Sequence, residues 1–91
     1  MWAWLFGQKR RQRDVLMYTR QGCHLCEQAW ETLERASRRY PLALRKVDID
    51  TDPALVEQHG GCVPVVVIDG RVRFRGVVNT VLLERVLRGG A

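Results

Sequence analysis

The sequence contains few cysteines and no long apolar segment. Its three cysteines are an odd number, whereas an extracellular domain held by disulfides normally pairs all of them, so the count favours a reducing compartment. No apolar run approaches the roughly 18 to 20 residues that are needed to span a bilayer. The first residues are apolar before they are basic, which is the reverse of a secretory signal. We therefore expect a cytoplasmic protein.

Internal repeats are also absent, and 91 residues suffice for one domain with a modest core of its own. Four of the 15 basic residues cluster near the N-terminus: Lys9, Arg10, Arg11 and Arg13. Removing these four lowers the formal charge from +5 to about +1, so the rest of the chain offers no basic surface for nucleic acid. We expect a tail of residues 1–13, which can touch an anionic membrane weakly through Trp2 and Trp4, and a domain of residues 14–91.

Hydrophobic periodicity divides the domain into strands and helices. The expected strands are 15–19, 42–50, 64–68 and 71–75, and the expected helices are 26–40, 53–59 and a last one from its cap Asn79 to Gly89. The first helix places acids early and bases late, and Pro41 ends it. The order β-α-β-α-β-β-α predicts an α/β fold in which helices flank a four-stranded mixed sheet.

The sequence Cys23-His24-Leu25-Cys26 lies where the first strand turns into the first helix. Two cysteines at this spacing could bind a metal, form a structural disulfide or exchange disulfides with another molecule. A helix N-terminus stabilises a thiolate, and Arg20 would add positive charge, so Cys23 is the expected nucleophile. Cys26 follows one turn later and is placed to attack a mixed disulfide at Cys23 as the resolving thiol.

Residues beside the pair are candidates for substrate contacts. His24 either assists the thiolate when charged or is exposed without a role, and Leu25 either offers an apolar patch to a partner or covers the core. The bond between Val63 and Pro64 has two interpretations. It is either cis, exposing Val63 backbone groups to an extended chain, or trans, with Pro64 simply opening a strand.

Four segments carry a family resemblance: YTRQGCHLC at 18–26, VDID at 47–50, CVPVVV at 62–67 and DG at 69–70. Through them the chain, from about Val15 to Leu87, resembles the short bacterial glutaredoxin-like proteins, which have the thioredoxin fold. The resemblance implies that fold, a cis bond before Pro64, and dithiol–disulfide exchange through Cys23 and Cys26.

The resemblance also implies binding partners. Arg20 stands where glutaredoxins often carry a basic residue that meets a carboxylate of glutathione. Asn79 lies where they usually carry an Asp at the start of the last helix. We expect a monomer that acts on disulfides of proteins or small molecules and is reduced by glutathione or by an enzyme similar to thioredoxin reductase. No cofactor beyond the redox-active disulfide and no nucleic acid are expected.

Cys62 leaves alternatives open. It is either a small buried side chain, a third redox thiol or a metal ligand. Cys23 and Cys26 together with His59 and Cys62 form a Cys3His set whose spacings suit zinc, and an iron–sulfur cluster on the thiols is a variant. A further alternative keeps the fold without catalysis, as an interaction module.

Overall fold

The computed structural model describes residues 12–89 and confirms the predicted order of elements. The strands are β1 (Arg13–Thr19), β2 (Leu42–Asp48), β3 (Val65–Ile68) and β4 (Arg71–Arg75). The helices are α2 (His24–Ser37), α3 (Pro53–His59) and α4 (Thr80–Gly89), and a 3-10 turn, η1 (Ile49–Thr51), connects β2 to α3. Almost all of the predicted tail, and with it the predicted membrane contact, lies outside the described residues.

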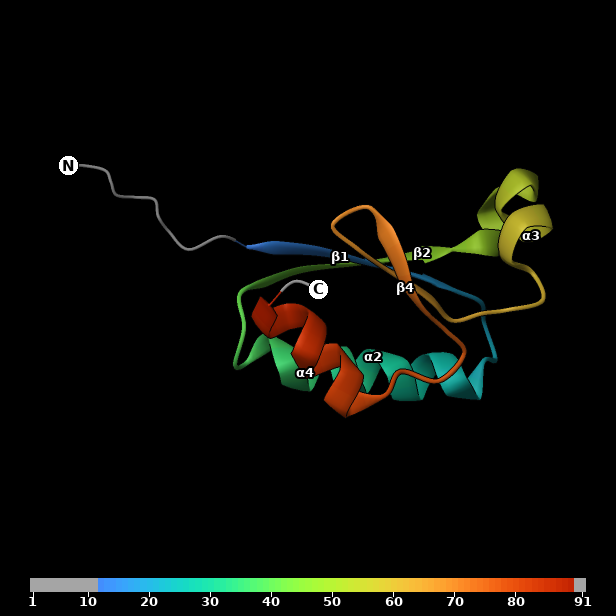
Figure 1. Ribbon diagram of the computed structural model, residues 1–91. Coiled ribbons are helices and arrows are strands. Elements are labelled where there is room, and N and C mark those ends of the chain that lie inside the picture. The colour runs from blue at the N-terminus through green and yellow to red at the C-terminus, as the bar shows by residue number, and fades with distance from the viewer. Residues whose placement is uncertain (1–11, 90–91) are drawn as a thin grey trace.

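The four strands form one mixed sheet in the order β2-β1-β3-β4. β1 pairs in parallel with β2, because α2 returns the chain between them, and it pairs antiparallel with β3. β3 and β4 form a hairpin whose turn residues, Asp69 and Gly70, take positive φ angles of 50° and 85°. Figure 1 shows α2 and α4 on one side of the sheet and α3 beyond the end of β2.

The core lies between the sheet and helices α2 and α4. Apolar side chains at alternate positions of β1 and β3 meet side chains that recur every three or four residues on the helices. The buried members of this cluster are Val15, Met17, Val66, Ile68 and Phe74 from the sheet, Cys26, Ala29, Leu33 and Ala36 from α2, and Val78, Leu83 and Leu87 from the C-terminal region. One cysteine of the pair is therefore part of the core.

β1 begins two residues earlier than its apolar pattern predicts, at Arg13. The Arg13 guanidinium donates to the carboxylate of Asp69 and to the carbonyls of Val86 and Leu87, at 3.2 and 3.1 Å. The cluster of basic residues around it placed Arg13 in the predicted tail. In the structure Arg13 is instead the first residue of β1, and it is bonded to the hairpin turn and to the last turn of α4.

Other element boundaries differ from the predictions by one to three residues. β2 ends at Asp48 instead of Asp50, because the Asp48 carboxylate accepts the N–H of Asp50 at 2.9 Å and starts η1. α2 begins at His24, in line with the expected place of Cys23 at or just before the first turn, and it ends at Ser37, short of the expected residue 40. No helix in the described part of the chain combines the length and apolar character needed to cross a bilayer.

Candidate active site

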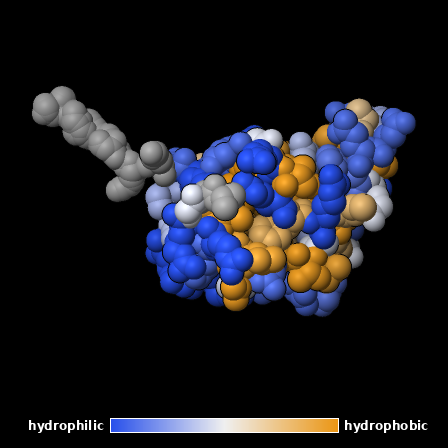
Figure 2. All heavy atoms as spheres, viewed as in Figure 1, coloured by the Kyte–Doolittle hydropathy of each residue, from blue (hydrophilic) through white to orange (hydrophobic). Residues whose placement is uncertain are grey.

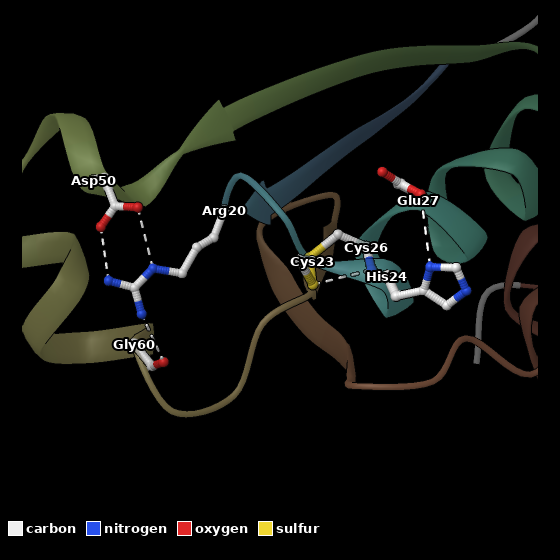
Figure 3. Close-up of a disulfide and its surroundings, with 7 residues drawn as sticks. All are labelled: Arg20, Cys23, His24, Cys26, Glu27, Asp50 and Gly60. Carbon is white, nitrogen blue, oxygen red and sulfur yellow. Dashed lines mark hydrogen bonds and ion pairs between the residues drawn. A yellow bond between two sulfur atoms is a disulfide. The ribbon is translucent and has the colours of Figure 1, made fainter.

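Cys23 and Cys26 form a disulfide at the start of α2, with their Cα atoms 5.2 Å apart (Figure 3). Gly22, with φ of +74°, turns the chain from β1 into the helix. Cys23 then has extended backbone angles and is the N-cap, and its Sγ accepts the backbone N–H of Cys26 at 3.1 Å. A sulfur atom thus takes the place that a Ser, Thr or Asp oxygen usually occupies at a helix start.

The two sulfurs lie in different surroundings. Cys26 is only 3% exposed and packs in the core cluster, whereas Cys23 is half-buried at its edge. Cys23 is therefore the more accessible of the two cysteines. The unpaired N–H groups of the first turn also point toward the Cys23 end of the helix, where they favour negative charge on a sulfur.

The Arg20 guanidinium was expected beside Cys23, but it binds elsewhere. Its Nε and Nη2 donate to the two carboxylate oxygens of Asp50 at 3.1 and 2.7 Å, and its Nη1 donates to the carbonyl of Gly60 at 3.2 Å. Figure 3 shows the guanidinium directed away from the disulfide. The hydrogen bond from Arg20 lowers the pKa of Asp50, and the same bond raises the pKa of Arg20. Arg20 thus connects the loop before Cys23 to η1 and to the end of α3.

His24 and Leu25, between the cysteines, are both exposed. His24 Nδ1 lies 3.8 Å from a carboxylate oxygen of Glu27, and Figure 3 shows the ring directed away from the disulfide sulfurs. Leu25 is 42% exposed, so it does not cover the core. It lines a small hollow with Val77 and Val78, next to the start of α4. Figure 2 shows hydrophobic atoms gathered over the segment before α4 and the adjoining start of that helix, whereas the rest of α4 presents hydrophilic atoms.

The other predicted contact residues lie in the segments after α3 and after β4. The Val63–Pro64 peptide bond is cis. Pro64 is buried, its carbonyl accepts the N–H of Gly76 at 2.7 Å, and Val63, like Cys23, packs against the core cluster. Asn79 caps α4, since its side-chain oxygen accepts the N–H of Leu82 at 3.0 Å. That acceptor is therefore already engaged within the chain.

Cys62 is a free and exposed thiol, so its interpretation as a small buried side chain is wrong. The ring of His59 stacks on Tyr18 at 4.5 Å between centroids, and its Nδ1 is buried without a hydrogen-bond partner. Within residues 12–89, no three His, Cys, Asp or Glu side chains come together in a way that could hold a metal ion. In the described part of the chain, the residues of the predicted Cys3His set therefore do not come together.

Sequence reasoning missed an open groove of about 570 Å³ that begins at the disulfide. Both cysteines line it, and it runs along α2 past Trp30 and Glu34. Lys46 of β2 lies across it, with Nζ 4.5 Å from the centre of the Trp30 ring. Part of the groove could have been predicted, because Glu27, Glu31 and Glu34 are spaced to share one side of a helix. The position of β2, whose Lys46 forms the other side of the groove, could not be predicted from the spacing of residues along the chain.

Comparison with known proteins agrees with this geometry. Residues 14–88 match the family model described as Glutaredoxin-like domain (DUF836). No curated protein matches the chain. A similar solved structure is protein XcR50 from X. campestris, which is 36% identical, with a TM-score of 0.65 over 78% of this chain and 91% of that chain.

Two more distant structures share the fold. Protein Ne2328 from Nitrosomonas europaea is 21% identical, with a TM-score of 0.77 over 90% of this chain and 99% of that chain. A thioredoxin from Fasciola hepatica is 20% identical, with a TM-score of 0.63 over 88% of this chain and 82% of that chain. The family match, the mixed sheet with its flanking helices and the disulfide at the start of α2 agree: the chain belongs to the glutaredoxin-like domain family and has a thioredoxin fold.

Proposed function

We propose that the protein is a thiol–disulfide oxidoreductase in which Cys23 is the nucleophile and Cys26 the resolving thiol. In the reduced protein, the Cys23 thiolate attacks one sulfur of a substrate disulfide, forms a mixed disulfide and releases the other sulfur as a thiolate. The Cys26 thiolate then attacks the Cys23 sulfur, which closes the Cys23–Cys26 bond and releases the second substrate thiolate. Two electrons pass from the protein dithiol to the substrate, and the released thiolates take up protons.

The observation that carries this proposal is the position of Cys23 as the N-cap of α2. The N–H of Cys26 points at the Cys23 sulfur, and the first turn adds its partial positive charge. Thiols in such positions have pKa values lowered from about 8.5 into the range of roughly 3.5 to 7.5. We therefore expect the reduced protein to carry a substantial fraction of thiolate at Cys23 at neutral pH.

The division of roles follows from burial. Cys26 is enclosed in the core, so an external disulfide reaches Cys23 first. A mixed disulfide at Cys23 nevertheless stays within reach of Cys26, which the oxidised structure shows bonded to it. In this proposal Leu25 and the Val63 backbone next to Pro64 contact the substrate, and His24 remains at the exposed rim of the site.

The substrate in this proposal is a disulfide of a protein or small molecule in the cytoplasm, and a monomer carries out the exchange. The reductant that restores the dithiol is a thiol such as glutathione or an enzyme similar to thioredoxin reductase. The side chains of Arg20 and Asn79, predicted to hold glutathione, have partners within the chain. These partners favour a reductant or substrate that is held by the loops around the disulfide and not by a dedicated glutathione cradle.

Trapping experiments test the assignment of the two thiols. The Cys26→Ser variant should accumulate a mixed disulfide with a model substrate, because the first attack occurs and the second does not. The Cys23→Ser variant should form none and lose turnover by orders of magnitude. Intact-mass spectrometry after acid quenching reads both results. Cys62→Ser is the matched control and should keep wild-type turnover, while adduct formation in Cys23→Ser equal to that in Cys26→Ser would contradict the assignment.

A further inference from the structure

We propose that the groove beside the disulfide selects cationic polypeptide segments as substrates over anionic ones. The inference rests on the proposed exchange at Cys23, and it names the class of disulfide that the site reduces. It follows from three features of the groove: where it begins, which charges line it, and what its aromatic wall already binds.

The groove begins at the reacting atoms. Cys23 and Cys26 line one end of the 570 Å³ hollow, with Gly22 and Gln21 of the preceding loop. From there it extends along α2 to Glu34, with Met17 of β1 and Lys46 of β2 on its other side. A chain whose disulfide is attacked at Cys23 therefore has room to lay its flanking residues against α2.

Negative charge dominates the lining of this groove. Glu27, Glu31 and Glu34 are all exposed, and each lines the groove from α2. Of the two basic side chains in the lining, Arg20 is matched by the carboxylate of Asp50, which leaves Lys46 against three glutamates. A row of like charges along one wall attracts a segment of opposite charge and raises the rate of productive encounter.

The aromatic wall of the groove already accommodates an ammonium group. Lys46 Nζ lies 4.5 Å from the centre of the half-buried Trp30 ring, a cation–π distance. The chain's own lysine thus shows that the Trp30 ring can hold an alkylammonium group at this wall of the groove. A lysine or arginine of a substrate would meet the glutamates of α2 along the groove and would compete with Lys46 for the Trp30 ring.

The overall charge of the protein predicts a preference for anionic substrates, which is the opposite of the preference proposed for the groove. At a formal charge of +5, long-range attraction alone would favour an anionic substrate. A preference for cationic substrates can therefore come only from the local lining of the site. Glutathione has more carboxylates than amino groups and is therefore negatively charged, so the glutamates of the groove disfavour its binding.

The experiment uses two synthetic peptides of equal length, each with one internal disulfide, flanked by lysine and arginine in one and by aspartate and glutamate in the other. The fully reduced, full-length protein is mixed with each peptide, so that its dithiol is the only electron donor. Second-order rate constants are divided by those for dithiothreitol, an uncharged dithiol, to remove differences in intrinsic reactivity. We expect the basic peptide to react roughly tenfold faster, and the ratio to fall toward one at high salt.

Matched variants locate the effect. Glu31→Lys changes the groove, and Glu57→Lys makes the same change of charge on α3, outside the groove. We expect Glu31→Lys to reduce the preference to about twofold or less and Glu57→Lys to leave it intact. Equal normalised rates for the two peptides, or equal losses in both variants, would overturn the inference and leave exchange at Cys23 standing. If neither peptide reacted, the proposed function would fail and this inference with it.

Discussion

At the scale of single residues, the arrangement around Arg20 shows how a side chain predicted for ligand binding serves a different contact. Its guanidinium meets both oxygens of Asp50 and the carbonyl of Gly60. These contacts connect the loop that carries Cys23 to the segment that leads into Val63 and Pro64. Since α3 has no buried residue of its own, this connection and the stacking of His59 on Tyr18 hold that segment against the sheet.

The pH dependence of this connection is a testable consequence. Because the pKa of Asp50 is lowered in the folded state, its contribution to stability is complete above the ordinary aspartate pKa of roughly 3.9. The contribution is lost as the pH falls through the lowered pKa. Asp50→Asn should therefore have a lower urea midpoint than wild type at neutral pH, and the two midpoints should converge in acid. A difference that stayed constant down to low pH would contradict this account.

At the scale of elements, most of the fold was predictable from the sequence, because apolar spacing and turn residues determine it locally. The β-branched run 64–68, the turn residues Asp69-Gly70 and the alternation in 71–75 predict the hairpin, and the structure contains it. The start of α2 was predictable, because the first strand turns into the cysteine pair and this places Cys23 at or just before the first turn. The structure adds that Cys23 is the N-cap, with its Sγ accepting the N–H of Cys26, although cysteine is not among the usual N-cap residues.

The cysteine pair of the candidate site was predictable, and its surroundings were not. The spacing of the two cysteines places both on one face of a helix, where the structure shows them bonded. The groove with Trp30 and Lys46, and the connection from Arg20 to Asp50, join residues of different elements. Sequence patterns predict each helix or strand separately, whereas tertiary packing determines which elements face each other. The contact of Lys46 with Trp30 and that of Arg20 with Asp50 could therefore not be predicted from residue spacing.

The cap of α4 provides a prediction at this scale. Asn79 accepts the N–H of Leu82, so Asn79→Ala should lower the free energy of unfolding by about 1 kcal/mol. Asn79→Asp should retain that stability, because a carboxylate accepts the same N–H and suits the helix N-terminus. Chemical denaturation of the three proteins measures the effect. If Asn79→Asp were as destabilised as Asn79→Ala, capping would not be the role of this side chain.

At the scale of the whole molecule, the two ends of β1 have different tasks. Thr19 leads into the loop that carries the disulfide, whereas Arg13, six residues earlier, joins the sheet to the hairpin turn and to the last turn of α4. The Asp69 carboxylate in that junction also accepts the N–H of Asp14, and that bond and the one from Arg13 lower its pKa. The Arg13 end of β1 thus connects parts of the fold, and the Thr19 end leads to the disulfide.

This separation predicts a variant that loses stability without losing chemistry. Arg13→Gln should lower the free energy of unfolding by about 1–2 kcal/mol, because Asp69 and two helix carbonyls lose a charged donor. For a domain of this size the expected decrease in Tm is about 5–10 °C. The rate of disulfide exchange, measured well below the Tm, should match wild type. A comparable loss of rate in the folded variant would show that the two ends of β1 are coupled.

The outer strands of the sheet have a consequence for behaviour at high concentration. β2 and β4 are the outer strands in the described sheet, and both carry exposed basic side chains: Arg45 and Lys46 on β2, Arg71 and Arg75 on β4. An outer strand with free backbone groups invites pairing with another copy, and repeated positive charge opposes that approach. If exchange takes place at Cys23 as proposed, this charge leaves the disulfide end as the part of the molecule that meets other proteins, because it opposes aggregation through the sheet edges at high concentration.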